Sequence, residues 1–459
     1  MGEAGFNRYL SGNFAPVTEE RTEFELNVTG EIPECLDGRY LRIGPNPIVA
    51  PDPARYHWFT GDGMVHGIKL GGGRAEWYRN RWVRAGAVPA ALGEVDPGGP
   101  GTPGADFAAN TNVIGLAGRT FALVEAGAKP VELGDDLETI GRCDFGGALM
   151  YGFTAHPKID PVTGELHAAD YFWAHPNVIE YAVIDNGGQV THIEEIPVPG
   201  KPMVHDLSIT ENYAVFYDLC VTFDLDSAAQ GSALPYVWDP DYGCRVGVLE
   251  RDRASGSPPK WFEVNPCYVF HAMNAFESTA PNGDELVVLD VVRHDRVFQT
   301  NRLAPDESLP TLWRWELNMV TGKATETQLG DGVLEFPRVD DRLTGRPYRY
   351  GYSLGVPSAD LNRGVSFDGA VISRHDMLNG TTESHELGTR MAGGEATFIP
   401  SSVDADEDDG YLMLFAYDMD TDRSELRILA AQDISGEPVA RVHLPVRVPF
   451  GFHGNWVPS

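Results

Sequence analysis

The chain has 459 residues, of which 42% are hydrophobic, and its formal net charge at pH 7 is −32. This acidity makes nucleic acids and anionic membrane surfaces poor partners, because both are themselves negatively charged. No stretch approaches the roughly 18 apolar residues of a membrane span, the N-terminus lacks a signal-peptide pattern, and the five scattered cysteines form no C-x-x-C pair. We therefore expect a soluble, cytoplasmic protein without a disulfide framework.

Two overlapping segments between residues 83 and 108 are considered first. The apolar stretch Val83–Leu92 fits either the mouth of a hydrophobic tunnel or a packed loop. The Gly/Pro-rich segment 90–108 is interpreted as an insertion between strands, because β-type patterning resumes unchanged after it. Because the sequence shows no domain linker, residues 1–459 are expected to form one domain.

Short apolar runs joined by tight-turn residues then recur along the chain. Examples are Val178–Ile184 before Asp185-Asn-Gly-Gly, Leu312–Leu317 before Val320-Thr-Gly, and Tyr411–Tyr417 before Asp418-Met-Asp-Thr. Such junctions are typical of β-hairpins, and long amphipathic helical patterns are absent. Many hairpins without a helical layer indicate an all-β propeller, barrel or sandwich. At this length a β-propeller fits best, and the lack of a strict repeat implies divergent blades.

Four histidines lie in separate strand-like segments among apolar residues. These segments are Gly-Phe-Thr-Ala-His156-Pro, Pro-Met-Val-His205-Asp-Leu, Cys-Tyr-Val-Phe-His271-Ala-Met-Asn and Phe-Gly-Phe-His453-Gly-Asn-Trp. None forms a local metal-binding clip with another, so only the fold can bring them together. The inner strands of a propeller line one axis and would do so. Four neutral imidazoles suit Fe(II), Cu or Zn.

The remaining histidines carry weaker signals. His57 and His66 flank a Gly-rich turn and are kept as alternative ligands. Six others lie in polar or charged surroundings and are interpreted as surface or satisfied core residues: His167, His192, His294, His375, His385 and His443. The acidic run at 404–409 lacks the closing glutamate of a calcium loop and is expected to be a solvated hairpin loop.

Three glutamates stand out because they interrupt apolar strand patterns: Glu125, Glu335 and Glu395. A carboxylate in such a place costs several kcal/mol unless it is paired. Histidine N–H groups would pair with these carboxylates and, in turn, have their tautomers fixed. The glutamates are therefore candidates to hold metal-binding imidazoles.

Over nearly its whole length the chain resembles the carotenoid cleavage oxygenase family. Besides the four histidine segments, the resemblance rests on Gly38-Arg-Tyr-Leu-Arg-Ile-Gly-Pro-Asn-Pro, the segment from His57 to Gly67, Ala109-Asn-Thr-Asn-Val, Phe-Ala-Leu-Val-Glu125 and Tyr236-Val-Trp-Asp-Pro-Asp-Tyr-Gly. It implies a seven-bladed propeller, capped by loops, with Fe(II) on its central axis.

The resemblance also implies the roles of individual residues. His156, His205, His271 and His453 match the iron ligands, and Glu125, Glu335 and Glu395 match the carboxylates that hold three of them. Thr111 matches the residue that crowds one open coordination position. The implied reaction is a dioxygenase reaction, in which an apolar alkene and O2 give two carbonyl products.

The substrate class depends on two positions. Stilbene-cleaving members resemble one another in a lysine before the first glutamate and in a Tyr-Arg-Asn-Pro segment upstream, which together grip the phenol. Here Val124 stands at the lysine position, and a Gly/Pro-rich loop replaces the upstream segment. A carotenoid or apocarotenoid is therefore favoured, with transient apolar contact with a bilayer at most.

Two alternatives remain open at this point. One is cleavage of a phenylpropenoid or stilbene alkene, of the isoeugenol or lignostilbene type. The other, from a different class, is a non-catalytic propeller scaffold that binds a ligand or a protein. The sequence specifies neither the oligomeric state nor which double bond is cut.

Overall fold

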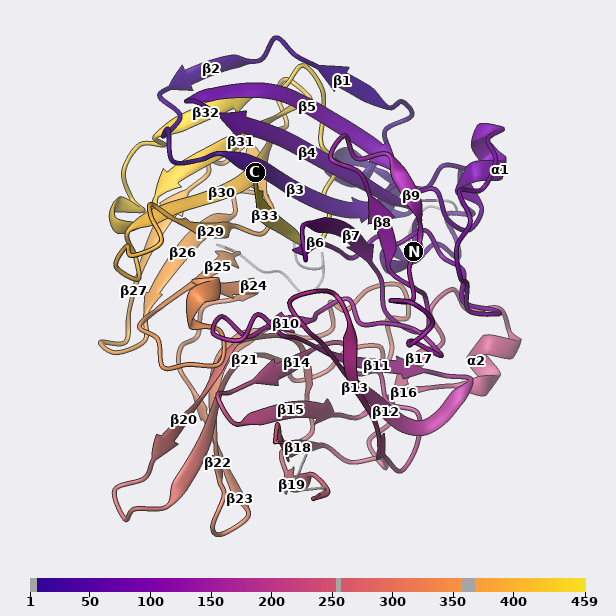
Figure 1. Ribbon diagram of the computed structural model, residues 1–459, viewed down its shortest axis with the longest axis vertical. Coiled ribbons are helices and arrows are strands. Elements are labelled where there is room, and N and C mark those ends of the chain that lie inside the picture. Colours follow the sequence, from indigo (N-terminus) through magenta and orange to yellow (C-terminus); the bar gives the residue numbers. More distant parts are fainter. Residues whose placement is uncertain (1–5, 253–256, 357–367) are drawn as a thin grey trace.

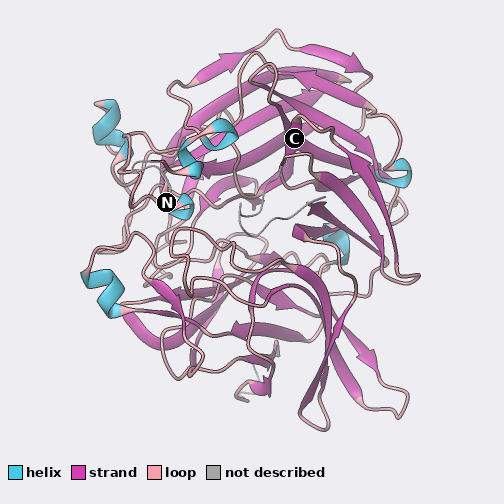
Figure 2. Ribbon diagram, turned by 180° about the vertical axis from the view of Figure 1, so that it is seen from behind, coloured by secondary structure: helices cyan, strands magenta, loops and turns pink. Residues whose placement is uncertain are grey.

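The computed structural model describes residues 6–252, 257–356 and 368–459, and in this part of the chain strands dominate. Its α-helices are α1 (Val88–Leu92) and α2 (Leu225–Ala229), both short and at the periphery of the molecule (Figure 2). Neither helix has the length or apolarity to span a bilayer. Five short 3-10 helices complete the helical content of the described residues: Arg8–Leu10, Gly12–Phe14, Trp58–Thr60, Asp341–Leu343 and Ala431–Asp433.

Seven antiparallel sheets of four to six strands form the blades of a propeller and surround the middle of the molecule (Figure 1). The first blade contains β1 (Arg21–Glu23), β5 (Arg74–Trp82), β4 (Gly63–Gly71), β3 (Gly38–Pro45) and β33 (Gly454–Pro458). The second contains β6 (Asn112–Leu116), β7 (Arg119–Leu123), β8 (Val131–Leu133) and β9 (Thr139–Arg142). The third contains β10 (Lys158–Ile159), β11 (Leu166–Phe172), β12 (His175–Ile184) and β13 (Val190–Pro197).

The remaining four blades follow in chain order. The fourth contains β14 (Leu207–Ile209), β15 (Tyr213–Asp218), β18 (Arg245–Glu250) and β19 (Lys260–Glu263), with the separate pair β16 (Val221–Phe223) and β17 (Tyr236–Trp238) inserted. The fifth contains β20 (Tyr268–Thr279), β21 (Glu285–His294), β22 (Thr311–Asn318) and β23 (Lys323–Gln328). The sixth contains β24 (Leu334–Val339), β25 (Tyr350–Gly355), β26 (Val371–Asp376) and β27 (Thr381–Glu386). The seventh contains β28 (Met391–Gly393), β29 (Thr397–Pro400), β30 (Gly410–Asp418), β31 (Arg423–Ala430), β32 (Ala440–His443) and β2 (Asn27–Gly30).

Strands from the two ends of the chain close the ring of blades. The C-terminal strand β33 pairs with β3, from Gly38 opposite Pro458 to Arg42 opposite Gly454. The N-terminal strand β2 pairs with β32 of the last blade. Figure 1 shows the yellow β33 beside the indigo β3. Pairing of distant strands in two blades resists opening of the ring, because no blade edge at the seam is left without a partner.

Burial differs between central and peripheral strands in the way that the sequence pattern requires. The central strands β3 and β11 are buried at every residue, whereas the outer strand β13 alternates and β27 is almost entirely exposed. Strands that are covered on both faces read as continuous apolar runs, and outer strands need only one apolar face. The predicted hairpin segments fall in β12 and β13, in β22 and in β30, and the all-β propeller prediction is confirmed.

The buried His375 on β26 couples stability to pH at a distance from the propeller axis. Its ring hydrogen-bonds to the Ser353 hydroxyl at 2.8 Å and to the Thr382 hydroxyl at 3.0 Å. Burial lowers the pKa of His375 from 6.5 to about 4. The unfolded chain therefore binds this proton more readily than the folded chain, and stability falls as the pH falls from 6.5 towards 4. The shift corresponds to about 3 kcal/mol.

We expect the His375→Gln protein to lose part of this pH dependence. Glutamine keeps a polar group beside Ser353 and Thr382 but does not titrate, so the urea midpoint should fall less between pH 6.5 and pH 4 than in the unchanged protein. The matched control is His443→Gln, at a ring that is 43% exposed. An unchanged slope for His375→Gln would contradict the assignment.

Candidate metal centre

Every blade contributes one predicted site residue near the start of its innermost strand, from two residues before it to the fourth residue within it. In order around the axis, the pairs are Thr111 with β6, His156 with β10, His205 with β14, His271 with β20, Glu335 with β24, Glu395 with β29 and His453 with β33. Neighbouring inner strands contact one another along most of this ring. The same end of each strand therefore faces the axis, and segments far apart in sequence meet there. Glu125 differs, since it follows the second strand of its blade, β7.

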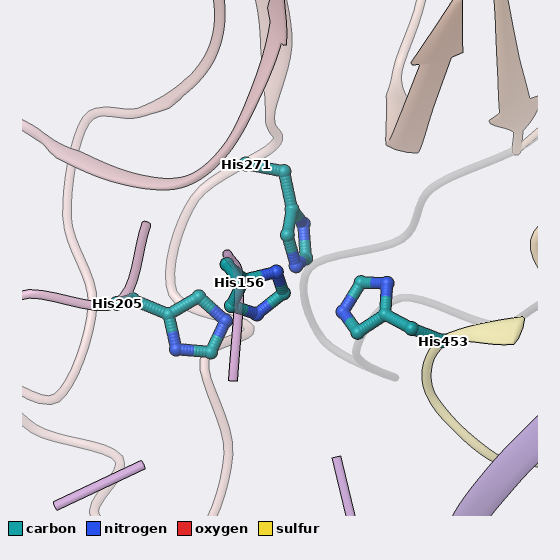
Figure 3. Close-up of side chains that lie close together, drawn as sticks. All are labelled: His156, His205, His271 and His453. Carbon is teal, nitrogen blue, oxygen red and sulfur yellow. The ribbon is translucent and has the colours of Figure 1, made fainter. Parts of the chain in front are cut away.

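The four histidines form one compact cluster (Figure 3). Their ligand nitrogens all lie within 4.8 Å of one another. The His156 ring centroid lies 4.4 Å from that of His205, 4.5 Å from that of His453 and 5.2 Å from that of His271. His156, His205 and His453 are 5–7% exposed, and the side chain of His271 is 11% exposed. Their rings point towards one another from four different blades, and this spacing leaves room for a single ion between them.

Three of the four imidazoles are held by the predicted glutamates. The Nδ1 atom of His205 lies 2.9 Å from Glu125 Oε1, that of His271 2.6 Å from Glu335 Oε2, and that of His453 2.9 Å from Glu395 Oε1. Each pairing assigns the proton to Nδ1 and turns the lone pair of Nε2 towards the cluster. His156 has no such carboxylate partner among the hydrogen bonds of the described residues.

Electrostatics keep the carboxylates ionised in this buried place. Burial opposes ionisation of Glu335, but His271 and His294 outweigh it and hold the pKa of Glu335 well below its usual range. At Glu395, burial is likewise outweighed by His453 and Arg338, which lower its pKa to about 2. Both groups are therefore anionic at neutral pH and can accept the imidazole N–H bonds.

The surroundings shift the pKa values of the imidazoles in two directions. Burial lowers the pKa of His156 well below its usual range, and the neighbouring rings act in the same direction. Burial also lowers the pKa of His453. At His271 burial opposes protonation, but Glu335 outweighs it and raises the pKa. His156 and His453 are thus held in the neutral form that a metal ligand requires.

The donor set fits a divalent transition metal. The Nε2 atoms of His156 and His271 are buried and have no hydrogen-bond partner within the described residues. A buried acceptor without a partner costs about 1–3 kcal/mol, and an ion at the centre of the cluster would satisfy both. Borderline ions such as Fe(II), Cu and Zn accept imidazole nitrogen.

Two glutamates reach the cluster through unusual backbone geometry. The residues that follow them, Ala126 and Phe336, have left-handed φ values of 65° and 53°. The pairing of β24 with β25 is also irregular between Glu335 and Arg338, and such a bulge re-aims side chains. The Phe336 N–H donates to Glu335 Oε2 at 2.8 Å, and its ring stacks on His271 with a centroid distance of 5.4 Å. Strain of this kind in residues other than glycine concentrates at functional sites.

Thr111 lies against the backbone of the His453 segment. Its carbonyl accepts a hydrogen bond from the His453 N–H at 3.1 Å, and its hydroxyl donates to Asn110 Oδ1 at 2.8 Å. The hydroxyl is thus engaged away from the imidazoles. Beside it, Gly451 approaches β3 so closely that a Cβ on Gly44 would lie 2.4 Å from the Gly451 Cα. Glycine at both positions lets the His453 segment cross β3.

The alternative prediction that His57 and His66 are metal ligands is wrong. Both are buried, but neither belongs to the cluster. His57 accepts the Phe59 N–H at 3.1 Å, and His66 bonds to the Tyr78 hydroxyl at 2.9 Å. They act as core residues around the Gly-rich turn, although His57 Nε2 is buried without a hydrogen-bond partner within the described residues.

His294, at the end of β21, is a residue of the centre that the sequence pattern did not single out. Its Nε2 donates to Glu335 Oε1 at 2.8 Å, so this carboxylate holds His271 and His294 together. The ring is buried, and its Nδ1 has no hydrogen-bond partner within the described residues. Phe270 packs edge-on against it with a centroid distance of 5.2 Å.

A large apolar cavity opens onto one side of the cluster. Its volume is about 870 Å³, and it reaches His205, His271 and His453. Aromatic side chains form much of its wall, among them Trp58, Phe59, Phe270, Phe336 and Phe452. Val124 and Thr111 also line it. Of the stretch Val83–Leu92, Gly86 and Ala87 line the cavity and Val83 and Val88 are buried, so both interpretations of this stretch hold in part.

Comparison with known proteins agrees with this architecture. Residues 14–458 match the family described as retinal pigment epithelial membrane protein, RPE65. The chain is 44% identical to a carotenoid cleavage oxygenase of Mycobacterium tuberculosis, over 99% of this chain and 98% of that protein. It is 34% identical to a carotenoid 9,10(9',10')-cleavage dioxygenase of Phaseolus vulgaris, over 98% of this chain and 89% of that protein.

Two solved structures share the fold over nearly their full length. One is a lignostilbene dioxygenase of Pseudomonas brassicacearum, with a TM-score of 0.87, 28% identity and 99% coverage of both chains. The other is the cobalt-substituted apocarotenoid oxygenase of Synechocystis, with a TM-score of 0.85, 27% identity and 97% coverage of both chains. The second structure contains cobalt as a substituted metal.

Proposed function

The chain belongs to the RPE65 family of carotenoid cleavage oxygenases, and on this premise we propose that it is a non-haem Fe(II) dioxygenase that cleaves a carbon–carbon double bond of a carotenoid or apocarotenoid. One observation carries the proposal: a buried four-histidine cluster opens directly onto an apolar cavity of about 870 Å³. In the balanced reaction the alkene and one O2 give two carbonyl products. The double bond breaks, and each of its carbons gains one oxygen atom.

His156, His205, His271 and His453 would hold the iron. Fe(II), when bound, supplies a site at which O2 binds and receives electron density. Four neutral imidazoles leave that site cationic, while Glu125, Glu335 and Glu395 keep three of the rings oriented. Thr111 lies on the cavity side and would restrict one face of the ion.

The rest of the chain positions the alkene. The aromatic walls of the cavity bind an extended apolar molecule and exclude water from the cluster. No paired general acid and base is required, because the reaction transfers no proton to or from the alkene. Residues 1–459 would act as one domain.

An apolar polyene fits the cavity better than a phenol does. Val124 lines the cavity. The stilbene-cleaving members of the family that the sequence resembles have a lysine at this position. The runner-up substrate, a hydroxystilbene or phenylpropenoid, has one observation in its favour. Lys201 also lines the cavity, with its ammonium 5.6 Å from the centre of the Phe223 ring, and would attract a phenolate oxygen.

Delivery of such a substrate would involve the rim of the cavity. Three lining residues are also exposed at the surface: Phe107 by 47%, Trp173 by 39% and Leu225 by 64%. We infer transient contact of this rim with an apolar surface, limited in strength by the net charge of −32. All five cysteines are free thiols, which supports the proposal of a cytoplasmic location.

The proposal is tested by incubating the anaerobically Fe(II)-loaded protein with O2 and a substrate panel. The panel contains a carotenoid, an apocarotenoid, a hydroxystilbene and isoeugenol, and the aldehydes are identified by mass spectrometry. We expect aldehydes from the polyenes. Products from the phenolic substrates alone would favour the runner-up, and a protein without stoichiometric iron would indicate the scaffold alternative.

Val124 should control this selectivity. In Val124→Lys, an ammonium enters the apolar wall at a cost of several kcal/mol unless it finds a partner. Turnover of the polyene should then fall by about tenfold or more. The matched control Val124→Leu keeps the wall apolar and should retain most of the turnover. Equal losses in both variants would show that shape at this position matters and charge does not.

A further inference from the structure

A second cavity, of different character, lies against the histidine cluster. It has a volume of about 280 Å³ and is lined by His156, His271 and His453. Of these two cavities, His205 lines the apolar one and not the second, and His156 lines the second and not the apolar one. The cluster therefore separates two spaces. We call the second one the polar cavity because its wall includes Asn112, Lys158, Asp206, Asn274, Arg338 and Asp341.

The polar cavity extends from the histidines to the protein surface. At its inner part, Lys158 Nζ lies 2.8 Å from Asp206 Oδ1, and this carboxylate is fully buried. At its outer part, the Asp341 side chain is 67% exposed and Ile159 is 38% exposed. Polar and charged groups thus follow the cavity from the cluster to the solvent.

The charged groups that face this space come from several blades. Arg338 is tied to Glu395 at 3.3 Å, to the Gly454 carbonyl at 3.0 Å and to Asn455 Oδ1 at 3.0 Å. Glu395 is in turn committed to His453. Asp206 Oδ2 accepts the Ala272 N–H at 3.0 Å beside His271. Among the described residues, Lys158 forms its ion pair with Asp206 alone, and its side chain is 23% exposed.

We infer that the polar cavity is the access route by which the metal ion reaches the histidines, with the Lys158–Asp206 ion pair as the electrostatic barrier on that route. This inference rests on the metal site of the proposed function. A hydrated divalent cation keeps its water among carboxylates and amides. The apolar cavity also contains carboxylates, such as Asp62, Asp106 and Asp306, but its wall is mainly aromatic and aliphatic. Along that wall a cation would lose hydration that the side chains do not replace, which is far more costly than burying a neutral polar group.

The two cavities then have separate tasks. The apolar cavity admits the alkene and O2, and the polar cavity admits the cation. Asp341 at the rim attracts a cation, whereas Lys158 repels it near the cluster. Because Asp206 can offset Lys158 or be left free to attract the ion, the pair sets the rate of uptake without supplying a ligand.

The test measures iron uptake itself. Anaerobic metal-free protein is mixed with Fe(II), samples are desalted at intervals, and bound iron is determined by elemental mass spectrometry. Lys158→Met should speed uptake by about tenfold, because it removes the repelling charge and leaves Asp206 to attract the ion. Asp341→Lys should slow uptake by a similar factor. The Asp341 side chain is 67% exposed, and the change removes its 3.5 Å ion pair with Arg338, which still has Glu395, the Gly454 carbonyl and Asn455 as partners. The final iron content should remain one per chain in both.

The control is Leu225→Lys, which places the same charge at the exposed rim of the apolar cavity. It should leave the uptake rate unchanged. Slower uptake in Leu225→Lys, with unchanged rates in Lys158→Met and Asp341→Lys, would overturn the route while leaving the metal site intact. Absence of iron binding by the unchanged protein would instead overturn the metal site of the proposed function, and the route with it.

Discussion

His271→Ala should yield a folded protein that retains little iron and has less than about 1% of the cleavage activity. The loss exceeds the 10–100-fold typical of removing a partner of a ligand, because it removes one of four donors and opens the cluster to water. Within the described residues, it also leaves Glu335 with His294 as its only histidine partner. Iron per chain after anaerobic loading and the rate of aldehyde formation measure the two effects.

The fold should survive this change. His271 lies at an irregularity in the β20–β21 pairing, which is regular again from Asn274 to Thr279, and the cavity left by one imidazole lies beside the existing cavities. We expect the unfolding midpoint to fall by only a few degrees, which corresponds to about 1–2 kcal/mol. The matched control is His192→Ala, on the outer strand β13, which should keep full iron content. Retained iron and turnover in His271→Ala would contradict the ligand assignment.

The sequence carries enough information for the fold class because propeller blades are local structures. Each hairpin is indicated by a short apolar run followed by turn residues, as in Val178–Ile184 followed by Asn186 and Gly187. The closure of the ring is different. The pairing of β33 with β3 joins residues more than 400 positions apart, and no local pattern around Gly38 or Pro458 specifies that partner.

The site residues could be found for a related reason. An ionisable residue at the start of an apolar inner strand conflicts with its surroundings, and the conflict marks function. The pairings among these residues could not be found. Glu125 holds His205, which lies two blades further on, although His156 is nearer in sequence. That choice depends on how far the chain after β7 reaches across the axis.

His294 was missed because its sequence neighbours are charged. It stands between Arg293 and Asp295, which suggests a surface position. The nearly continuous apolar run from Leu286 to Val292 gives the better signal, since β21 is buried on both faces there and His294 continues the buried face of Val292 and Asp290. Arg293, on the other face, places its guanidinium 4.3 Å from the centre of the Trp313 ring.

Glu335→Gln is the second change with a large expected effect. The carboxylate accepts from both His271 and His294, and an amide has only one oxygen to offer. If that oxygen stays on His271, the amide nitrogen faces the His294 N–H, and one proton must move to the partnerless Nδ1 of His294. We expect iron affinity to fall by about 10–100-fold, measured by competition with a chelator at fixed pH.

Two further variants separate the charge of Glu335 from its position. Glu326→Gln changes a poorly exposed carboxylate that bonds to Asn265, away from the cluster, and should leave iron affinity unchanged. His294→Phe removes the second donor but keeps the carboxylate on His271, so it should retain more affinity than Glu335→Gln. If His294→Phe instead weakens iron binding as much as Glu335→Gln does, then the carboxylate acts by being clamped between two rings, and its charge alone does not account for the effect. Affinity in Glu335→Gln equal to that of the unchanged protein would show that Glu335 does not hold His271 for the metal.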